Sequence, residues 1–581
     1  MPALEDLLAA RLSAALATVT DGPAEPLIAR SAHADFQINA ALPLARRLGK
    51  APREIAAQVL AAADLDGLAT GEVSGPGFIN LTVAADVLWA AVAEKAMDAR
   101  LGLTSPLHGQ RIIVEYSGPN VAKEMHVGHL RSTVIGDAIA RTLEFLGADV
   151  IRQNHIGDWG TNFGMLIAYL AEHGEPATTA GSGDAAMTRL DRLYRAARAV
   201  FVSDPAFVDR SRAQVVALQA GDPAAVAAWQ GIVAESKRYF GEVYDLLGIG
   251  LTDADIDAES FYNPALVETA ATLAELGVAE TSAGALCVFF DGVRGPDGSP
   301  APLIVRKSDG GFGYPATDIA TVRHRVATLH ADRIIYVVDA RQALHFRMVF
   351  DTARRAGWLP ATVIVEHVPF GTVLGADGRP FKTRSGATIR LISLLNQAVD
   401  RAAVVIAAKN PDLSPSEVAL RAREVGIGAV KYADLSTGRT RDYVFDLDRM
   451  VSLAGNTGVY LQYAHARVRS ILRKAGRAGC TGAGRSVDVA TPMVDAERRL
   501  VLRLDDFAGV VLASAETSEP HRLCTYLFEL AQTLSAFWDA CPVLKAPDER
   551  TRANRLALCQ LTADTLRQGL SLLGIAAPER L

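Results

Sequence analysis

Residues 117–132 read SGPNVAKEMHVGHLRS and join a strand-like run to a helix-like run. The run before them, RIIVEYS (111–117), is rich in β-branched residues and predicts a buried strand. The run that begins with the HVGH of this stretch, HVGHLRSTVIGDAIARTLEFLG (126–147), has apolar residues at helical spacing. A strand, a loop and a helix in this order are typical of a parallel βαβ unit. The loop is therefore expected at the carboxyl edge of a parallel sheet, where open α/β sheets bind ligands.

The same alternation continues on both sides of a long interruption. DVIRQNHIGDWG (149–160) supplies a second strand, and DRIIYVVDA (332–340) and TVIVEHVPF (362–370) supply two more. The interruption, about 165–300, is expected to be mostly helical. We therefore predict an α/β domain with a parallel sheet over residues 106–455, carrying a helical insertion.

Two further domains are expected at the ends of the chain. Residues 1–105 begin with helical periodicity and end in the strand-like GFINLTV (77–83), which predicts an N-terminal α+β domain. Residues 456–581 contain long helical patterns and no convincing strand, which predicts an all-α C-terminal domain. A basic stripe suited to phosphates, which a solvated helix face explains equally well, is formed there by Arg467, Arg469, Arg473 and Lys474.

The composition is that of a globular cytoplasmic protein. Half of the 581 residues are hydrophobic and 21% are charged, which excludes a disordered chain. The net charge of −6 means that a polyanion would be met by local patches. The five cysteines form no CxxC pair, which argues against a zinc ribbon and a disulfide framework. No run of about 18 uncharged apolar residues occurs, so no membrane span is predicted.

The start of the predicted helix carries residues suited to phosphate chemistry. Backbone N–H groups and the helix dipole favour an anion there, and His126 and His129 place two imidazoles on one helix face. Gly128 lets a phosphate or a flat ring approach the backbone. These features suit a nucleoside triphosphate that is attacked in line at its α-phosphate. A metal site is disfavoured because no carboxylate or cysteine has the usual zinc spacing, whereas two structural histidines remain an alternative.

Residues 117–167 as a whole resemble the nucleotide-binding segment of class I aminoacyl-tRNA synthetases, and specifically of the arginyl-tRNA synthetase family. The tetrapeptide HVGH is similar to the HIGH signature of that class, with valine at its second position. The resemblance covers nearly the whole chain and is weakest over about 175–300. The other segments that resemble the family, in its order, are DFQINAALPLARRLGKAPREIA, GFINLTV, GYPATDIA, VVDARQALHF, PFKTRSG, YLQYAHARVRSILR and LLGIAAPERL.

This resemblance implies an arginine–tRNA ligase. Such an enzyme joins the carboxylate of L-arginine to the α-phosphate of ATP, releases pyrophosphate, and passes arginine to the 2′-hydroxyl of the terminal adenosine of tRNA(Arg). The resemblance further implies that arginine is activated only with tRNA bound. We expect Mg²⁺ on the phosphates, no tightly bound cofactor or structural zinc, and a monomer. The three regions become a tRNA-contacting N-terminal domain, a Rossmann-like catalytic domain and an anticodon-binding domain.

The resemblance also assigns the residues that act on ATP. Lys123, His126, Gly128 and His129 are the expected catalytic set. The second signature of the class, KMSKS, corresponds to FKTRSG (381–386), where an arginine stands in place of the usual lysine and Lys123 is thought to supply the missing charge. The predicted contacts to ATP are Pro119, His126, Gly128, His129, Lys382, Thr383, Arg384 and Ser385.

The side chain of arginine requires carboxylates, because guanidinium forms paired charge-assisted hydrogen bonds with them. Without the resemblance, Glu115 would be a strand-end charge and Tyr314 a packing aromatic. Family members commonly have serine at position 118, where this chain has Gly118. The resemblance makes the arginine site Glu115, Ser117, Asn120, His126, Tyr314, Asp318 and Gln342.

The role of one more segment is undecided, and two other functions are possible from the sequence. NHIGDWG (154–160) is expected to border the site, although a purely structural role explains it equally well. Another HxGH nucleotidyltransferase would need neither the helical C-terminal domain nor an acidic pocket. A non-catalytic tRNA-binding paralogue should have lost a motif histidine.

Overall fold

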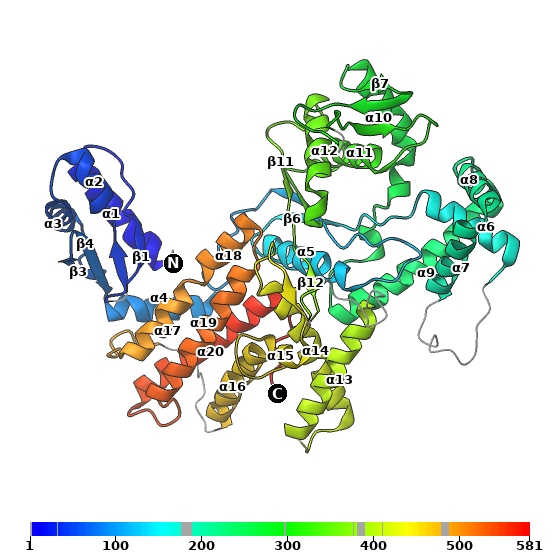
Figure 1. Ribbon diagram of the computed structural model, residues 1–581. Coiled ribbons are helices and arrows are strands. Elements are labelled where there is room, and N and C mark those ends of the chain that lie inside the picture. The colour runs from blue at the N-terminus through cyan, green and yellow to red at the C-terminus, as the bar shows by residue number, and fades with distance from the viewer. Residues whose placement is uncertain are drawn as a thin grey trace.

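The computed structural model describes residues 3–31, 33–175, 189–295, 298–375, 377–379, 390–409, 411–477 and 487–581. Figure 1 shows an N-terminal lobe at one side, a central sheet with its covering helices, a helical arm, and a bundle of C-terminal helices below. The predicted multidomain fold, with a parallel-sheet domain between an α+β region and an all-α region, is confirmed.

Four parallel strands in the order β11-β10-β5-β6 form the central sheet. Their order shows that the chain starts at an inner strand, adds β6 on one side, and later adds β10 and β11 on the other. The direction of addition therefore reverses between β5 and β10, which is the switch point where such sheets bind ligands. The strands are β5 (Arg111–Glu115), β6 (Asp149–Gln153), β10 (Arg333–Tyr336) and β11 (Ile364–His367).

Both faces of this sheet are buried, as expected of parallel strands. Ile112 and Val114 of β5 belong to the large core that contains α5, whereas Ile113 between them belongs to a second core with α10, α11 and α12. The helices that cover the two faces are α5 (Val127–Phe145), α10 (Asn263–Glu275), α11 (Tyr314–Ala327) and α12 (Ala343–Arg355), with the 3-10 turn η3 (Ala340–Gln342) before the last.

The interruption between β6 and α11 contains a helical part and a small sheet. We expected it to be mostly helical, and its helices are α6 (Thr161–His173), α7 (Arg189–Ser203), α8 (Pro205–Gln219), α9 (Pro223–Leu247), η1 (Asp253–Asp255), η2 (Glu259–Tyr262) and α10. The sequence pattern did not reveal a three-stranded antiparallel sheet, because each of its strands has only three or four residues: β7 (Glu280–Ser282), β8 (Ala285–Val288) and β9 (Leu303–Arg306).

The segment after β11 links the sheet to the C-terminal bundle. Its elements are β12 (Val373–Leu374), α13 (Leu391–Lys409), α14 (Pro415–Leu435), β13 (Tyr443–Val444) and α15 (Leu447–Met450). By length and composition, α13 is the one helix in the described ranges that could cross a membrane. It packs on α14, and its Arg401 forms an ion pair with Asp448 at 2.8 Å. A core helix of a folded domain passes the same test.

The N-terminal region is an α+β unit, as the pattern predicted. An antiparallel sheet in the order β1-β2-β4-β3 packs against helices, and the predicted strand GFINLTV corresponds to β4. The elements are α1 (Leu4–Thr20), β1 (Ile28–Arg30), β2 (Phe36–Ile38), α2 (Ala41–Leu48), α3 (Pro52–Ala62), β3 (Ala69–Ser74), β4 (Phe78–Val83) and α4 (Ala85–Met97).

The C-terminal region is helical, and the described residues from 456 onward contain no strand. The helices pack around a core rich in leucine, and α16 and α20 both contact other helices of the bundle. Their bounds are α16 (Gly458–Arg477), α17 (Asp495–Asp505), α18 (Phe507–Thr517), α19 (His521–Ala540) and α20 (Glu549–Leu572).

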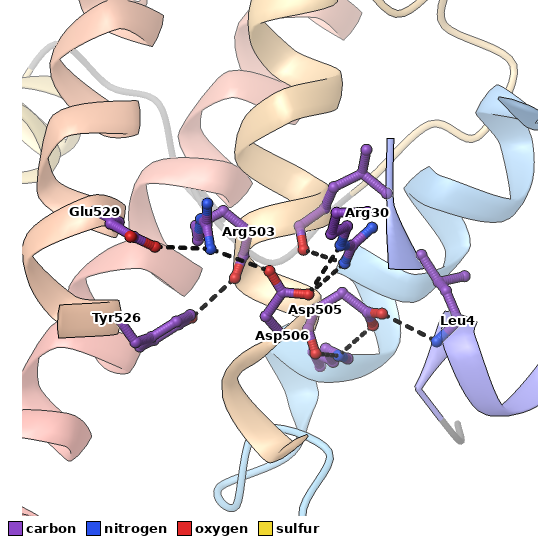
Figure 2. A network of polar contacts seen from close by, with 9 residues as sticks. Leu4, Arg30, Arg503, Asp505, Asp506, Tyr526 and Glu529 are labelled. Carbon is purple, nitrogen blue, oxygen red and sulfur yellow. Dashed lines mark hydrogen bonds and ion pairs between the residues drawn. The ribbon is translucent and has the colours of Figure 1, made fainter. Parts of the chain in front are cut away.

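A polar network joins the first and last regions of the chain (Figure 2). The backbone N–H of Leu4 donates to Asp505 at 2.9 Å, and Arg30 donates to Asp506 at 3.1 Å. Asp505 also forms a buried ion pair with Lys95 at 2.6 Å. Because breaking one side of a buried ion pair is costly, this network holds α1 and α4 against α17.

Candidate active site

A cavity of about 760 Å³ opens at the carboxyl edge of the central sheet. Its walls come from the loops that follow β5, β6 and β10, and from the first turns of α5, α11 and α12. The cavity therefore lies at the switch point of the sheet. The predicted site residues that line it are Glu115, Ser117, Asn120, His126, Gly128, His129, Tyr314, Asp318 and Gln342.

The two histidines of HVGH cap the helix that carries them. Nδ1 of His126 accepts a hydrogen bond from the backbone N–H of Gly128 at 3.0 Å. Nδ1 of His129 accepts one from the backbone N–H of His126, also at 3.0 Å. The ring centroids are 4.0 Å apart. Because Nδ1 is an acceptor in both rings, the proton of each neutral imidazole is on Nε2, which leaves two N–H donors for a ligand.

Both imidazoles are held in the neutral state. Burial lowers the pKa of His129 to about 3, and the charges of His126 and Lys123 act in the same direction. Burial and then Lys123 also lower the pKa of His126. The pair therefore offers hydrogen bonds rather than full positive charges to an anion at the start of α5.

Gly128 is required by the packing of His126. A Cβ at this position would lie 2.8 Å from Cε1 and 2.9 Å from Nδ1 of the His126 ring. These distances are shorter than a carbon contact allows, so the ring would have to leave its capping position. The glycine thus serves the geometry of the histidine pair as well as access to the backbone.

The loop after β5 is fixed by hydrogen bonds to a helix of the insertion. The hydroxyl of Ser117 contacts the hydroxyl of Tyr244 in α9 at 2.7 Å, and Thr133 donates to Ser117 at 3.0 Å. Asn154 accepts from the backbone N–H of Gly118 at 3.0 Å and donates to Tyr244 at 3.0 Å. Ser117 therefore lines the cavity with its hydroxyl already engaged in holding the loop.

The backbone of this loop is tightly constrained. Ser117 and Gly118 have φ values of 73° and 52°, a region that suits glycine and strains serine. Asn120 pairs with Gly157 through a backbone bridge, and a Cβ on Gly157 would lie 2.5 Å from the Asn120 side chain. Pro119 is buried, its carbonyl accepts the N–H of Gly157 at 3.2 Å, and it is not among the residues that line the cavity.

Three carboxylates also line the cavity, on segments other than the one that carries HVGH, and the part of the cavity that they line is called the carboxylate end. Glu115 ends β5, Asp318 lies in the first turns of α11, and Glu259 comes from η2 in the insertion. Nε2 of His345 in α12 lies 2.6 Å from Asp318. Oε2 of Glu115 lies 2.6 Å from Nη2 of Arg325. The cluster gives this end of the cavity a negative field suited to an organic cation.

Both burial and neighbouring carboxylates disfavour the charged form of Glu259. Burial raises the pKa of Glu259 to about 8, and the charges of Asp158 and Asp318 raise it further. Burial followed by the charges of Glu259 and Asp318 also raises the pKa of Tyr314, which is 63% exposed at the mouth of the cavity. A cation between these groups would relieve the repulsion among them.

Lys123 lies three residues before His126, close to the histidine pair but outside the cavity lining. Its Nζ lies 5.1 Å from the centre of the Tyr194 ring. Lys382, Thr383, Arg384 and Ser385 lie outside the described residues. The chain is described again from Arg390, which forms an ion pair with Glu124, and the N–H of Leu391 donates to Met125 at 2.9 Å. The end of the segment that contains FKTRSG is therefore bonded beside HVGH.

Three family models match successive parts of the chain. The arginyl tRNA synthetase N terminal domain matches residues 3–83, the class I (R) tRNA synthetase catalytic domain matches 94–447, and the DALR anticodon binding domain matches 461–581. The catalytic model alone spans more than half of the chain. The chain belongs to the arginyl-tRNA synthetase family.

Individual relatives agree with this assignment. The arginine–tRNA ligase of Frankia casuarinae is 58% identical over 566 residues, which cover 96% of this chain and 95% of that protein. The arginine–tRNA ligase of Streptomyces avermitilis is 53% identical, with 99% and 98% covered. The crystal structure of arginyl-tRNA synthetase from Plasmodium falciparum superposes with a TM-score of 0.82 at 26% identity over the full length of both chains. The Thermus thermophilus arginyl-tRNA synthetase gives 0.78 at 28% identity, with 99% and 100% covered.

The basic stripe of the DALR region is partly engaged within the chain. Arg469 forms an ion pair with Glu579 at 2.8 Å, and Arg473 donates to the carbonyl of Glu579 at 2.8 Å. Arg467 stacks on the ring of Trp538 at 4.6 Å, and Lys474 is exposed. Of the aromatic residues in this region, which could stack exposed bases, Phe537 is a core residue, Tyr460 is half-buried and Tyr463 is exposed.

NHIGDWG borders the cavity and is also structural. His155 and Gly157 line the cavity, whereas Asn154 and Asp158 are buried. Asp158 accepts hydrogen bonds from the N–H and the hydroxyl of Ser260, at 2.9 and 2.6 Å. Both interpretations of this segment therefore apply, to different residues.

Three side chains that lie in or beside this site were not identified from the sequence. Glu259 and Tyr244 lie in the stretch where the resemblance was weakest, and no local pattern marks them. His345 belongs to VVDARQALHF, one of the segments that resemble the family, so the resemblance could have marked it. Within the described ranges, no three His, Cys, Asp or Glu side chains gather so as to hold a metal ion.

Proposed function

We propose that the cavity forms arginyl-adenylate, with the triphosphate at the HVGH end and the guanidinium of arginine at the carboxylate end. The reaction is that of an arginine–tRNA ligase, which activates L-arginine with ATP and esterifies it to tRNA. The observation that supports the proposal is that two imidazoles held neutral and three carboxylates, carried by separate segments of the chain, line one cavity.

The HVGH end supplies hydrogen bonds to the phosphates. The Nε2–H groups of His126 and His129 are free of the capping bonds and suit the oxygens of the α-phosphate, whose charge grows as the carboxylate of arginine attacks in line. Lys123 supplies a full positive charge nearby, since it acts on the pKa of both histidines. Pyrophosphate leaves on the side of Arg390, which bridges to His126 and forms an ion pair with Glu124.

The carboxylate end selects the side chain. Glu115, Glu259 and Asp318 surround the guanidinium, Tyr314 closes the mouth, and Asn120 and Gln342 orient the amino and carboxyl ends of arginine. A neutral side chain of the same shape would desolvate the carboxylates without supplying a positive charge, so the pocket rejects it. Most of the rate enhancement comes from positioning and charge stabilisation, without a covalent enzyme intermediate.

The second step and the physiological setting follow from the same assignment. The 2′-hydroxyl of the terminal adenosine of tRNA(Arg) attacks the carbonyl of the adenylate, and the DALR region with Arg467, Arg469, Arg473 and Lys474 faces the tRNA. Mg²⁺ would be held by the phosphates and water, because the described residues provide no cage for it. We place the protein in the cytoplasm as a monomer that needs tRNA to activate arginine.

Arginine-dependent exchange between pyrophosphate and ATP tests the proposal. We expect exchange with L-arginine only when tRNA(Arg) is present. Exchange driven by another amino acid and unaffected by arginine would refute the specificity. Exchange without any amino acid would favour another HxGH nucleotidyltransferase, and tRNA binding without exchange would favour a non-catalytic paralogue. The acidic pocket counts against the first alternative, and the presence of both motif histidines counts against the second.

A further inference from the structure

A buried arginine lies directly beneath the floor of the carboxylate end. Arg325 belongs to α11, seven residues after Asp318 on the same face of the helix, and its side chain is fully buried. Its Nη2 lies 2.6 Å from Oε2 of Glu115, whose side chain is 12% exposed to the cavity. Glu115 thus stands between an internal guanidinium below and the space proposed for the guanidinium of the substrate above.

Arg325 contacts a single row of residues across the sheet. Glu115, Gln153 and Tyr336 are register partners at the ends of β5, β6 and β10. Nε of Arg325 donates to Oε1 of Gln153, and its guanidinium stacks on the ring of Tyr336 at 4.8 Å. Since register partners in a parallel sheet point to the same face, these three contacts fix the guanidinium from three neighbouring strands at once.

Gln153 of this row also contacts the segment that carries Glu259. The side-chain amide of Gln153 donates to Asp257, two residues before Glu259. The N–H of Glu259 itself is bonded to the carbonyl of Ile156 at 3.1 Å. Arg325 therefore contacts Glu115 directly, is linked to the Glu259 segment through Gln153, and shares a helix with Asp318.

We propose that Arg325 is a positioning residue for substrate arginine: by occupying Oε2 of Glu115, it turns the other carboxylate oxygen toward the cavity and sets the depth at which the substrate guanidinium stops. Its positive charge also offsets part of the negative charge that three neighbouring carboxylates would otherwise concentrate. This inference rests on the proposed role of Glu115 in binding arginine.

The arrangement differs from that of an ordinary stabilising ion pair. Arg323, two residues earlier on α11, forms such a pair with Glu268 at 2.7 Å and stacks on Trp358 at 5.0 Å, away from the cavity lining. Loss of Arg323 removes a contact of partly exposed residues, whereas loss of Arg325 leaves Glu115 desolvated and free to rotate. The two arginines thus form a matched pair for an experiment.

The test is a double-mutant cycle of Arg325 and Glu115 in full-length protein, read as the KM values for arginine and ATP in tRNA-dependent exchange. We expect Arg325→Met to raise the KM for arginine about 30-fold or more while the KM for ATP changes less than about threefold. Arg325→Lys, which keeps the charge, should recover part of this loss. Arg323→Met should leave both constants unchanged.

In the Glu115→Gln background, removal of the Arg325 guanidinium should change the KM for arginine by less than about threefold, because its target is neutral. Equal effects of the Arg325 substitution in both backgrounds would overturn the inference. If Arg325→Met does not fold, Arg325→Lys in both backgrounds gives the same comparison. If Glu115→Gln has a normal KM for arginine, the role proposed for Glu115 is wrong and the inference about Arg325 is wrong with it. If Glu115→Gln raises the KM for arginine but the effects of the Glu115 and Arg325 substitutions are additive, only the inference about Arg325 is wrong.

Discussion

The two ends of the cavity are built in different ways. At the histidine end, His126, Gly128 and His129 form a unit of four consecutive positions whose hydrogen bonds close within one helical turn. At the carboxylate end, Glu115, Glu259 and Asp318 come from three separate segments, with 203 positions between the first and the last, and meet only in the folded protein. The histidine end is a local motif, whereas the carboxylate end is a product of the whole fold.

This difference has an electrostatic counterpart. The histidines hold their geometry by capping a helix, and burial keeps them neutral. Two of the three carboxylates instead depend on a partner from another element: Glu115 on Arg325, and Asp318 on His345. Substitutions at the histidine end should therefore act on the chemical step, and those at the carboxylate end on the affinity for arginine.

The largest effect is expected for His129→Ala. The substitution removes an Nε2–H donor and the cap of the His126 backbone, so adenylate formation should slow by about 10²- to 10³-fold. Single-turnover measurements of adenylate formation check this, with tRNA affinity measured in parallel and expected to be nearly unchanged. His108→Ala, in an exposed loop, is the control. Normal turnover of His129→Ala would show that the histidine pair is structural only.

A smaller effect, on the affinity for arginine rather than on the chemical step, is expected for Asp318→Asn. The substitution removes a charge from the guanidinium site and keeps an oxygen for His345, so the KM for arginine should rise by about 10- to 100-fold with the KM for ATP unchanged. Steady-state exchange measures both constants, and Asp351→Asn on α12 serves as the control. A fall in kcat with an unchanged KM for arginine would contradict the division between the two ends.

The affinity for arginine should also depend on pH through Glu259. Its pKa is raised to about 8 in the empty pocket, chiefly by burial, so the group is protonated at pH 6. A guanidinium beside it favours the ionised form, so binding releases a proton and tightens by up to about tenfold per pH unit from pH 6 to about 8, then levels off. Calorimetric titration with arginine across this range tests the slope, and Glu259→Gln should abolish it. A slope of the opposite sign would exclude a cation next to Glu259.

The smallest effect is expected for Tyr314→Phe. Tyr314 lies at the mouth of the cavity and is largely exposed, so the loss of one hydroxyl should raise the KM for arginine by only about threefold. Exchange kinetics of this variant beside Tyr169→Phe, on α6, checks the value. A change of more than about 30-fold would mean that the mouth, rather than the three carboxylates, holds the side chain.

Sequence alone could reveal the histidine end because its information is local. A strand, a turn and a helix start place His126 and His129 correctly, and the element order predicts the parallel sheet. Glu259 could not be found this way, since it lies in a short 3-10 turn without periodicity. Arg325 looks like one more charge on an amphipathic helix, and only the packing of α11 on three strand ends shows that it is buried.

The central claim is that the two ends of one cavity hold the two reacting molecules. A crystal structure with L-arginine, a non-hydrolysable ATP analogue and tRNA(Arg) tests it most directly. The account predicts the guanidinium between Glu115, Glu259 and Asp318, and the α-phosphate within hydrogen-bond distance of Nε2 of His126 and His129. A guanidinium bound elsewhere, or phosphates remote from the start of α5, would contradict it.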